Sequence, residues 1–531
     1  MSDDERSSEP EFWSTTILAW GTLALFLLGA AFLSEGWLQP DEHSRVLEPA
    51  HHHVFGYSTL PWEFDPKSPM VSYLLGVIYA PLLAWANHLT DNSLIQAGFL
   101  RAFTALVCST RLLALALLLR HLGLSYAKRS RYLILMGLGI FGPLLFLRTS
   151  QENWATTCLI WAISLIMTAV PIDSLQQSRL WQWSAQPSQI GPRSYRRFFL
   201  IGLLLALGTS FRLQLGVTAV SLGLLTVWTF GWRRPLACII LGGLCGLLPM
   251  AIVDWNTVGQ PFLPAWNYLS YALSNEGGGQ SWGVSPWYWY FKEYFLTWFP
   301  PLSIFILPLL LVGFSRRPIY ALVFLPFLFE HLLLGHKEVR YFSPMVPLLF
   351  LAAFDGWEYC KKFVPKFMVP ILGRQGWTTG WLWLNSSVGI GAALLPLNTA
   401  PRMYKALHDR QRAGEIPQTL TLVGNTNRSA LQFYYRNPQT IPPLLTIREF
   451  FTQIENHEER GWYALYSINT NQLKDIETSC TNHFQSIPAW VRALYSLSPT
   501  IPARKPIHAI VFCPGPSTNH VSVSKKANET L

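Results

Sequence analysis

Two adjacent carboxylates, Asp41 and Glu42, follow the first long apolar segment of the chain. A carboxylate within hydrogen-bonding distance of a hydroxyl can take its proton while the oxygen attacks an electrophile, so the pair is a candidate general base. The pair also has a structural interpretation, because Asp41 follows Pro40 and Asp is a common helix N-cap. A solvated loop would explain it as well, and the surrounding residues must decide.

A second candidate is the basic turn of residues 335–341, which follows another apolar run. It carries His336, Lys337 and Arg340, and such a cluster suits an anionic phosphate because Arg can contact two phosphate oxygens at once. The alternative is an ordinary charged connection between two membrane spans. Positive charge is disfavoured on the non-cytoplasmic side, where the span order given below places this turn.

Aromatic and amide side chains, among them those of Asn267, Trp287 and Tyr290, are frequent in residues 254–291, a stretch that begins with Asp254. Such a surface suits the faces of sugars, or it marks the aromatic belt of a membrane interface, which the residues alone favour. Further charged or titratable residues fall within expected membrane spans, where burial of a charge is costly. They are therefore candidates for a functional role, and internal ion pairing is the alternative explanation. They are Arg101, Arg111, Arg212, Glu330 and His331.

No metal or cofactor site is expected. The sequence contains no D-x-D, H-E-x-x-H or P-loop motif. The triplet His51, His52 and His53 resembles a metal-binding tract, but consecutive histidines cannot easily converge on one ion. The missing D-x-D argues against an enzyme that uses a metal and a sugar nucleotide.

The composition predicts a multi-pass membrane protein. Of 531 residues, half are hydrophobic and only 13% are charged. Apolar segments of about 17–25 residues, long enough to cross ~30 Å of hydrocarbon, recur along the first ~400 residues. The net charge of +10 comes from short basic clusters between these segments. That pattern is typical of cytoplasmic loops rather than of a nucleic-acid surface.

Five basic clusters, all taken as cytoplasmic, predict about eleven transmembrane spans. The expected spans are residues 12–32, 96–119, 131–148, 152–170, 198–211, 214–231, 236–253, 293–313, 318–335, 341–360 and 381–397. The apolar run 70–85 contains Pro81 and is interpreted as a helix lying at the outer interface. Counting it as a span would put the first basic cluster on the same side as Asp41 and reverse every later assignment.

This span order brings the candidate residues to one face of the membrane. The segments expected on the non-cytoplasmic side are the first loop 34–69, the second loop 254–291, the turn at 336–341 and the tail 401–531. The carboxylate pair, the aromatic stretch and the cations would therefore face the same compartment. This convergence favours a functional site over a helix cap.

The tail of residues 401–531 alternates apolar and polar residues, which predicts a small α/β or mainly β appendage to the membrane domain of residues 1–400. Cys480 and Cys513 lie in it, and they either form a disulfide in an oxidising compartment or remain free thiols. Sequons for N-glycosylation begin at Asn427 and Asn528.

Four ordered motifs between residues 37 and 347 resemble one known family. The matching residues in the first loop are Pro40, Asp41, Glu42, Glu48, Ala50, His51, Phe55, Gly56, Trp62 and Glu63. Those in the second loop are Asp254, Gly259, Asn267, Gly283, Pro286, Trp287 and Tyr290. The remaining matches are Phe211, Arg212, His336, Lys337, Glu338 and Arg340. Together they look like the motifs of the family 22 glycosyltransferases, the polytopic mannosyltransferases of glycosylphosphatidylinositol-anchor and N-glycan-precursor synthesis.

The resemblance implies an all-α C-type glycosyltransferase fold, a polyprenyl (dolichyl) phosphate mannose donor, inversion at the anomeric carbon and no metal. Asp41 would be the catalytic base, with Glu42 beside it. The residues implied to hold the donor phosphate are His336, Lys337, Arg340 and Arg212. The implied substrate-binding residues are Trp62, Glu63, Asp254, Asn267, Trp287 and Tyr290. The implied partners are the donor, a glycolipid acceptor and membrane lipids, with no nucleic acid.

Four departures from the family pattern leave the acid untouched but leave the acceptor open. Gln39 replaces His, Val339 replaces Glu and Leu213 replaces Pro, and residues 65–68 stand where an Arg-Ser pair follows the Trp-Glu segment. The alternative from another class is a transporter or flippase of lipid-linked or sugar solutes. Transporters usually show internal repeats, and none is visible here. The expected location is the endoplasmic reticulum membrane in a eukaryote or the cytoplasmic membrane in a bacterium, with the site on the non-cytoplasmic face.

Overall fold

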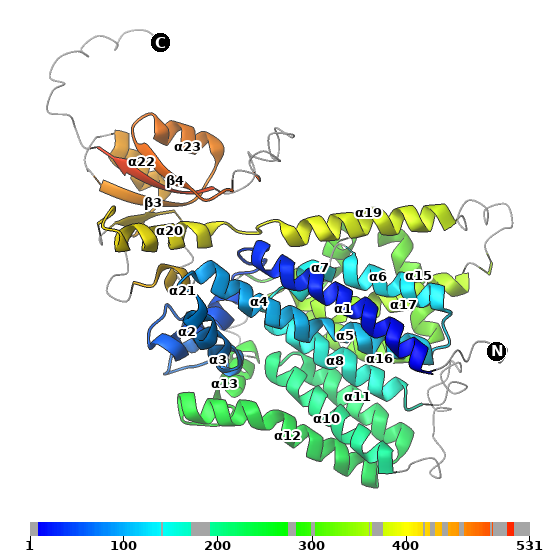
Figure 1. The fold of residues 1–531 in the computed structure, drawn as a ribbon. Helices are drawn as coiled ribbons and strands as arrows, with labels where there is room; N and C mark the ends of the chain where they lie inside the picture. The colour runs from blue at the N-terminus through cyan, green and yellow to red at the C-terminus, as the bar shows by residue number, and fades with distance from the viewer. Residues whose placement is uncertain are drawn as a thin grey trace, which may run out of the picture.

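The protein is mainly helical, with a small sheet near the C-terminus (Figure 1). The computed structural model describes residues 9–139, 142–170, 192–273, 283–298, 303–360, 362–363, 375–417, 420–424, 431–437, 444–455, 461–488, 491 and 507–514. The sequons at Asn427 and Asn528 lie outside these residues.

Helices lie at the predicted apolar runs, and further short helices lie in the predicted loops and at the start of the tail. Those of the N-terminal half are α1 (Glu9–Leu33), α2 (Glu48–Phe55), α3 (Leu74–Leu89), α4 (Ser93–Ser109), α5 (Arg111–His121), α6 (Tyr126–Leu138), α7 (Gly142–Phe146), α8 (Gln151–Met167), α10 (Pro192–Phe211) and α11 (Leu215–Phe230). Those that follow are α12 (Arg233–Val258), α13 (Leu263–Leu273), α14 (Trp289–Glu293), α15 (Ser303–Arg316), α16 (Pro318–Leu333), α17 (Val346–Cys360), α19 (Gln375–Leu394) and α20 (Ala400–Arg412).

Three helical segments in the described part of the chain are long and apolar enough to cross a bilayer: Ser14–Leu33, Ser93–His121 and Arg233–Val258. A fourth span results if α15 and α16, which meet at an angle of 118°, are counted as one broken span. The chain is thus a membrane protein with several apolar helices, and the total of eleven spans stays a prediction. The predicted run 131–148 is divided into α6 and α7.

Small residues allow the helices to approach closely. A Cβ atom on Gly202 of α10 would lie 2.1 Å from the carbonyl oxygen of Ile239, and one on Gly242 of α12 would lie 2.0 Å from that of Phe199. Lipid tails are as apolar as leucine, so close backbone packing of this kind is a main source of helix association in a membrane. The α10–α12 pair ends beside the cavity described below.

The tail folds as a mixed α/β unit, as its alternating pattern predicted. Its sheet has the strand order β2-β1-β3-β5-β4. The strands are β1 (Thr421–Val423), β2 (Leu444–Leu445), β3 (Gly461–Ile468), β4 (Thr481–Gln485) and β5 (Ile507–Cys513), and α21 (Leu431–Tyr435), α22 (Ile447–Glu455) and α23 (Thr470–Glu477) alternate with them. Strand β1 is parallel to β2 and β3, whereas β5 is antiparallel to β3 and β4. Cys480 and Cys513 form a disulfide.

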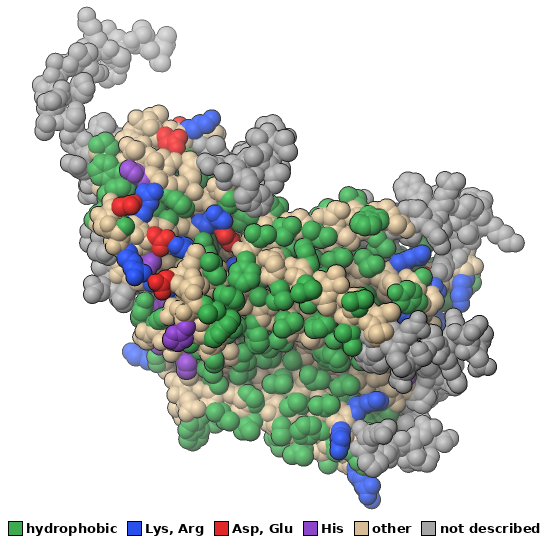
Figure 2. Space-filling model, in the orientation of Figure 1, with side chains coloured by type: hydrophobic (Ala, Val, Ile, Leu, Met, Phe, Trp, Pro, Cys, Tyr) green, Lys and Arg blue, Asp and Glu red, His purple; other side chains and the backbone are tan. Residues whose placement is uncertain are grey.

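The surface agrees with a membrane-embedded body. In Figure 2, hydrophobic side chains cover the helical part of the visible face, whereas charged and histidine side chains gather at the upper left, around the sheet and the segments next to it. A second group, mostly Lys and Arg, lies at the lower right. This polarity is expected of a protein with one water-facing domain and basic loops on the opposite side.

Candidate active site

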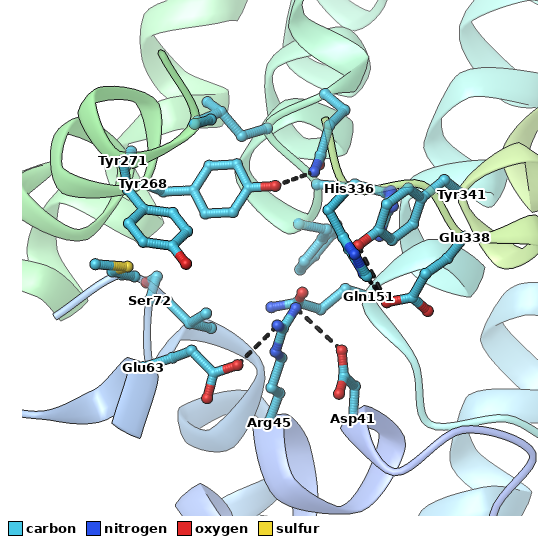
Figure 3. A pocket seen from close by; sticks show the side chains of 18 of the residues that line it. Asp41, Arg45, Glu63, Ser72, Gln151, Tyr268, Tyr271, His336, Glu338 and Tyr341 are labelled. Atoms are coloured by element: carbon cyan, nitrogen blue, oxygen red, sulfur yellow. Dashed lines mark hydrogen bonds and ion pairs between the residues drawn. The ribbon is translucent and has the colours of Figure 1, made fainter. Parts of the chain in front are cut away.

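A cavity of about 440 Å³ opens where several segments of the chain that are far apart in the sequence meet. Its size lies within the usual range of small-molecule sites. The first loop, the end of α10 and α13 line it together with the residues just before α3 and just after α16 (Figure 3). Of the residues expected from the sequence to bind substrate or react, those that line it are Asp41, Trp62, Glu63, Arg212, His336 and Arg340.

Asp41 projects into this cavity from the first helical turn after Pro40. That turn continues into a short π-helix, His43–Leu47, which carries Arg45 one turn further on. The Asp41 carboxylate lies between two guanidinium groups, with Oδ2 3.1 Å from Nη1 of Arg45 and 2.8 Å from Nη1 of Arg340. Asp41 is therefore a cavity carboxylate held by cations rather than a solvated loop residue.

Glu42 points away from the cavity. Its Oε1 accepts hydrogen bonds from the backbone amides of Leu38 (2.9 Å) and Gln39 (3.0 Å), and Oε2 lies 3.7 Å from Nη1 of Arg148. Burial raises the pKa of the Glu42 carboxyl to about 7, against the opposing effect of Arg148. The two adjacent acids thus have different positions, because Glu42 closes the turn that presents Asp41.

The basic turn forms the opposite wall and is organised by Glu338. This carboxylate accepts hydrogen bonds from Nε2 of His336 (3.0 Å), Nη2 of Arg340 (2.9 Å) and the hydroxyl of Tyr341 (3.2 Å). Burial alone would raise the pKa of Glu338, but Arg340 and His336 hold it below its ordinary value. Lys337 does not line the cavity, since its Nζ donates to the carbonyl of Leu334.

Arg212 follows the last residue of α10 and joins the same wall. Its Nη1 lies 2.5 Å from Oε1 of Glu152, and its guanidinium lies 4.7 Å from the centre of the Tyr341 ring. Only 4% of the residue is exposed, and its Nε and Nη2 have no hydrogen-bond partner among the described residues. A buried guanidinium with unused donors that lines a cavity is suited to an anionic ligand.

An aromatic wall faces these cations. Trp62, in the short 3₁₀-helix Trp62–Phe64, and Tyr271 of α13 have ring centroids 5.9 Å apart at an angle of 55°. Tyr268, one turn earlier on α13, accepts a hydrogen bond from Nε2 of Gln214 at 2.5 Å. Burial raises the pKa of the Tyr268 hydroxyl above its ordinary value, so it stays neutral at physiological pH.

Arg45 lies between Asp41 and Glu63, 2.9 Å from Oε1 of Glu63 (Figure 3). Burial alone would lower the pKa of its guanidinium, but Asp41 and Glu63 raise it, so Arg45 stays charged. The two carboxylates are thereby held on either side of one cation. This spacing keeps Asp41 and Glu63 apart on the cavity floor.

The other four expected substrate-binding residues lie outside the cavity. Oδ1 of Asp254 accepts a hydrogen bond from Ser72 (2.5 Å), and Nδ2 of Asn267 donates to the carbonyl of Pro69 (2.9 Å). Both therefore fix the segment before α3 that lines the cavity. Tyr290 packs on Phe342 with ring centroids 4.5 Å apart, and the exposed Trp287 packs on Tyr288 and Phe291. These residues support the walls or lie on the surface.

Several residues of the site were not identified from the sequence. Two of them carried a signal, because Arg45 is one helical turn from Asp41 and Glu338 belongs to the basic turn. Tyr268 and Tyr271 are single members of a long aromatic stretch and carried none. In the described part of the chain, no group of three or more His, Cys, Asp or Glu side chains converges as a metal site.

Three comparisons with known proteins bear on the family and the fold of this chain. The sequence matches the model of the Alg9-like mannosyltransferase family over residues 18–411. It is 25% identical over 352 residues to mannosyltransferase APTG1 of Arabidopsis thaliana, covering 63% of this chain and 57% of that protein. It is 24% identical over 354 residues to GPI mannosyltransferase 3 of Yarrowia lipolytica, covering 65% of this chain and 63% of that protein. It is 22% identical over 388 residues to human alpha-1,2-mannosyltransferase ALG9, covering 69% of this chain and 58% of that protein.

The matched regions span about three fifths of the length of these relatives. Among solved structures, ArnT of Cupriavidus metallidurans bound to undecaprenyl phosphate superposes with a TM-score of 0.52 at 12% identity, over 93% of this chain and 97% of that one. This likeness confirms the C-type glycosyltransferase fold expected from the sequence. With the family model matched over most of the chain, the protein belongs to the Alg9-like mannosyltransferase family.

Proposed function

We propose that this protein transfers mannose from a polyprenyl (dolichyl) phosphate donor to a hydroxyl group of a glycolipid, with inversion at the anomeric carbon. The observation that carries the proposal is the position of Asp41 in a cavity whose neighbouring wall holds Arg212, His336 and Arg340. A base and a phosphate-binding surface within one cavity are the two parts that this reaction needs.

In the proposed step, the acceptor oxygen forms a bond to the anomeric carbon as the bond from that carbon to the phosphate oxygen breaks. Asp41 takes the proton of the acceptor hydroxyl, and the lipid phosphate leaves with the electron pair. Arg340 and Arg212 stabilise the charge that develops on the phosphate, since guanidinium donors match two phosphate oxygens. His336 adds a third donor from the same wall.

The relatives support the sugar, because they are named as a GPI mannosyltransferase and, for ALG9, an alpha-1,2-mannosyltransferase. ArnT, which shares the fold, is described with undecaprenyl phosphate bound. A lipid phosphate carrying the sugar is therefore the donor class that we infer, without a resident metal.

We place the reaction on the non-cytoplasmic side, in the endoplasmic reticulum membrane of a eukaryotic host or the cytoplasmic membrane of a bacterial one. Two observations support this assignment. The disulfide Cys480–Cys513 requires an oxidising compartment. The basic clusters of the membrane domain fit a cytoplasmic location on the opposite side.

The test is transfer of labelled mannose from polyprenyl phosphate mannose in membranes that contain the endogenous glycolipids. Asp41→Asn should lower the rate about a hundredfold or more, because an amide cannot accept the proton. Asp91→Asn is the matched control, since 79% of the Asp91 side chain is exposed and it lies outside the cavity. Equal amounts of both variants in the membrane with retained turnover in Asp41→Asn would overturn the proposal.

A further inference from the structure

Three guanidinium groups occur in the described lining of the cavity, and each has a carboxylate partner. Arg45 and Arg340 pair with Asp41, which lines the cavity itself. Arg212 instead pairs with Glu152, which contacts it from outside the cavity lining. Arg212 is therefore a cation whose counter-ion need not be displaced when a substrate enters.

The packing of two helices brings Glu152 and Arg212 together. Glu152 is the second residue of α8, and Arg212 follows the last residue of α10. The helices lie close to each other, since a Cβ atom on Gly208 of α10 would be 3.4 Å from that of Cys158 on α8. The start of α8 and the end of α10 meet at the cavity, where Gln151 is part of the lining (Figure 3). Only 12% of the Glu152 side chain is exposed.

We propose that Glu152 is a positioning residue that sets how tightly the lipid phosphate binds. It holds Nη1 of Arg212, so that Nε and Nη2, which have no hydrogen-bond partner among the described residues, are free for the phosphate. Its charge also weakens the attraction of Arg212 for the phosphate, so that the product can leave. The inference rests on the proposed function and deepens it, because it assigns product release to a residue that does not touch the substrate.

The charge of the product explains why such a counter-ion is useful. The donor is a phosphodiester with one negative charge, whereas the polyprenyl phosphate left after transfer is a monoester with a charge of about −1.5 to −2 near pH 7. A wall of uncompensated cations would therefore bind the product more tightly than the donor. Glu152 opposes this effect, because only 4% of Arg212 is exposed and charges in such a poorly solvated place interact more strongly than in water.

A purely structural role is the alternative, since an acid in the first turn of a helix interacts favourably with the helix dipole. Such a role would stabilise α8 without affecting the phosphate. The two roles differ in how the binding of polyprenyl phosphate responds to the charge of Glu152, and in whether that response needs Arg212.

The test measures the Kd of the purified full-length protein in detergent for polyprenyl phosphate and for polyprenyl phosphate mannose. Glu152→Gln keeps an oxygen acceptor for Nη1 of Arg212 but removes the charge. We expect the Kd for polyprenyl phosphate to fall about tenfold and that for the donor to fall less than about threefold, because the product carries more charge. Inhibition of mannose transfer by the product should strengthen about tenfold as well.

Two further variants separate the charge of Glu152 from its contribution to the fold. Glu152→Asp keeps the charge, so its Kd for polyprenyl phosphate should stay within about threefold of that of the unaltered protein. In an Arg212→Gln background, Glu152→Gln should change this Kd less than about twofold, because the cation on which it acts is gone. An acid that only stabilises α8 would have the same effect in both backgrounds.

The matched control is Asp355→Asn. Asp355 of α17 forms a similar ion pair with Arg317 (2.6 Å), its side chain is 11% exposed, and it does not line the cavity. Its replacement should leave the Kd for polyprenyl phosphate unchanged.

Unchanged or weaker binding of polyprenyl phosphate by Glu152→Gln overturns this inference while leaving mannose transfer intact. So does a gain of the same size in Glu152→Asp or in the Arg212→Gln background. If the unaltered protein neither binds polyprenyl phosphate nor transfers mannose, the proposed function itself is overturned, and this inference with it.

Discussion

At the scale of single residues, adjacent acids of the same type take different positions. Asp41 lines the cavity between Arg45 and Arg340, whereas Glu42 binds the backbone of the turn before it. The sequence predicted that the pair and the cations of residues 335–341 lie on the same side of the membrane, because the order of the apolar runs determines the side of each segment. It could not indicate which of the two side chains points inward, because neighbouring residues on a helix are rotated by about 100° relative to each other.

The pH dependence of stability should report on Glu42. Its pKa is raised by burial to about 7 in the folded protein, against 4.5 as the reference. A raised pKa means that its contribution to stability is present below pH ~4.5 and is lost as the pH rises through ~7. Thermal unfolding in detergent should therefore show that the free energy of unfolding of Glu42→Gln rises relative to that of the unaltered protein between pH 5 and 8.5. The difference should be on the order of 2–3 kcal/mol at pH 8.5.

Glutamine keeps an acceptor for the amides of Leu38 and Gln39, so Glu42→Gln should also keep most of its transfer activity. Asp91→Asn serves as the control, because that exposed carboxyl should leave the difference in unfolding free energy constant across the pH range. Parallel curves for Glu42→Gln and the unaltered protein would show that Glu42 is not a buried titrating group.

At the scale of elements, apolar length predicted where helices lie but not how each crosses the membrane. A helix satisfies its own backbone hydrogen bonds, so any apolar run of sufficient length in a bilayer becomes one. The break between α15 and α16 falls at Pro318, where the sequence predicted the start of a new span, whereas the division of residues 131–148 into α6 and α7 was not predicted. The placement of α3 at the interface stays a prediction.

Glu48 joins three elements behind the cavity. It is fully buried in α2, and it accepts hydrogen bonds from the backbone amides of Phe433 in α21 (3.0 Å) and Thr59 (3.2 Å). Its Oε1 also lies 3.1 Å from Nε2 of His43, whose ring stacks on Tyr434. The contacts tie the tail to the π-helix that follows Asp41 and Glu42.

Removal of this carboxylate should loosen the catalytic loop. Glu48→Ala leaves buried donors unsatisfied and should cost about 3 kcal/mol of stability, with a loss of transfer activity, whereas Glu48→Gln keeps the acceptor and should retain part of both. Thermal unfolding and mannose transfer measure the two effects. Glu415→Ala is the control, since 60% of its side chain is exposed. Unaltered stability in Glu48→Ala would contradict this role for the contact.

At the scale of the whole molecule, the tail and the first loop are in direct contact. Arg402 of α20 is paired with Glu35, with Nη2 2.8 Å from Oε1, and Leu397 donates to the carbonyl of Glu35 at 3.0 Å. The side of the membrane on which the sheet domain lies is therefore also the side of Asp41. Sequence reasoning placed both on one face through the count of basic loops but could not show that they touch, because these contacts join residues more than 350 positions apart.

The accessibility of the disulfide Cys480–Cys513 to a reductant can show on which side of the membrane the sheet domain lies. In sealed vesicles with the cytoplasmic face outward, the membrane-impermeant reductant TCEP should leave the disulfide intact, whereas it should reduce the bond once detergent opens the membrane. Maleimide mass tags on the released thiols measure the reduction. A Cys480→Ser, Cys513→Ser double variant identifies the signal against the five cysteines that are free in the structure. Reduction in sealed vesicles would place the sheet domain, and with it the Asp41 loop that it contacts, on the cytoplasmic side.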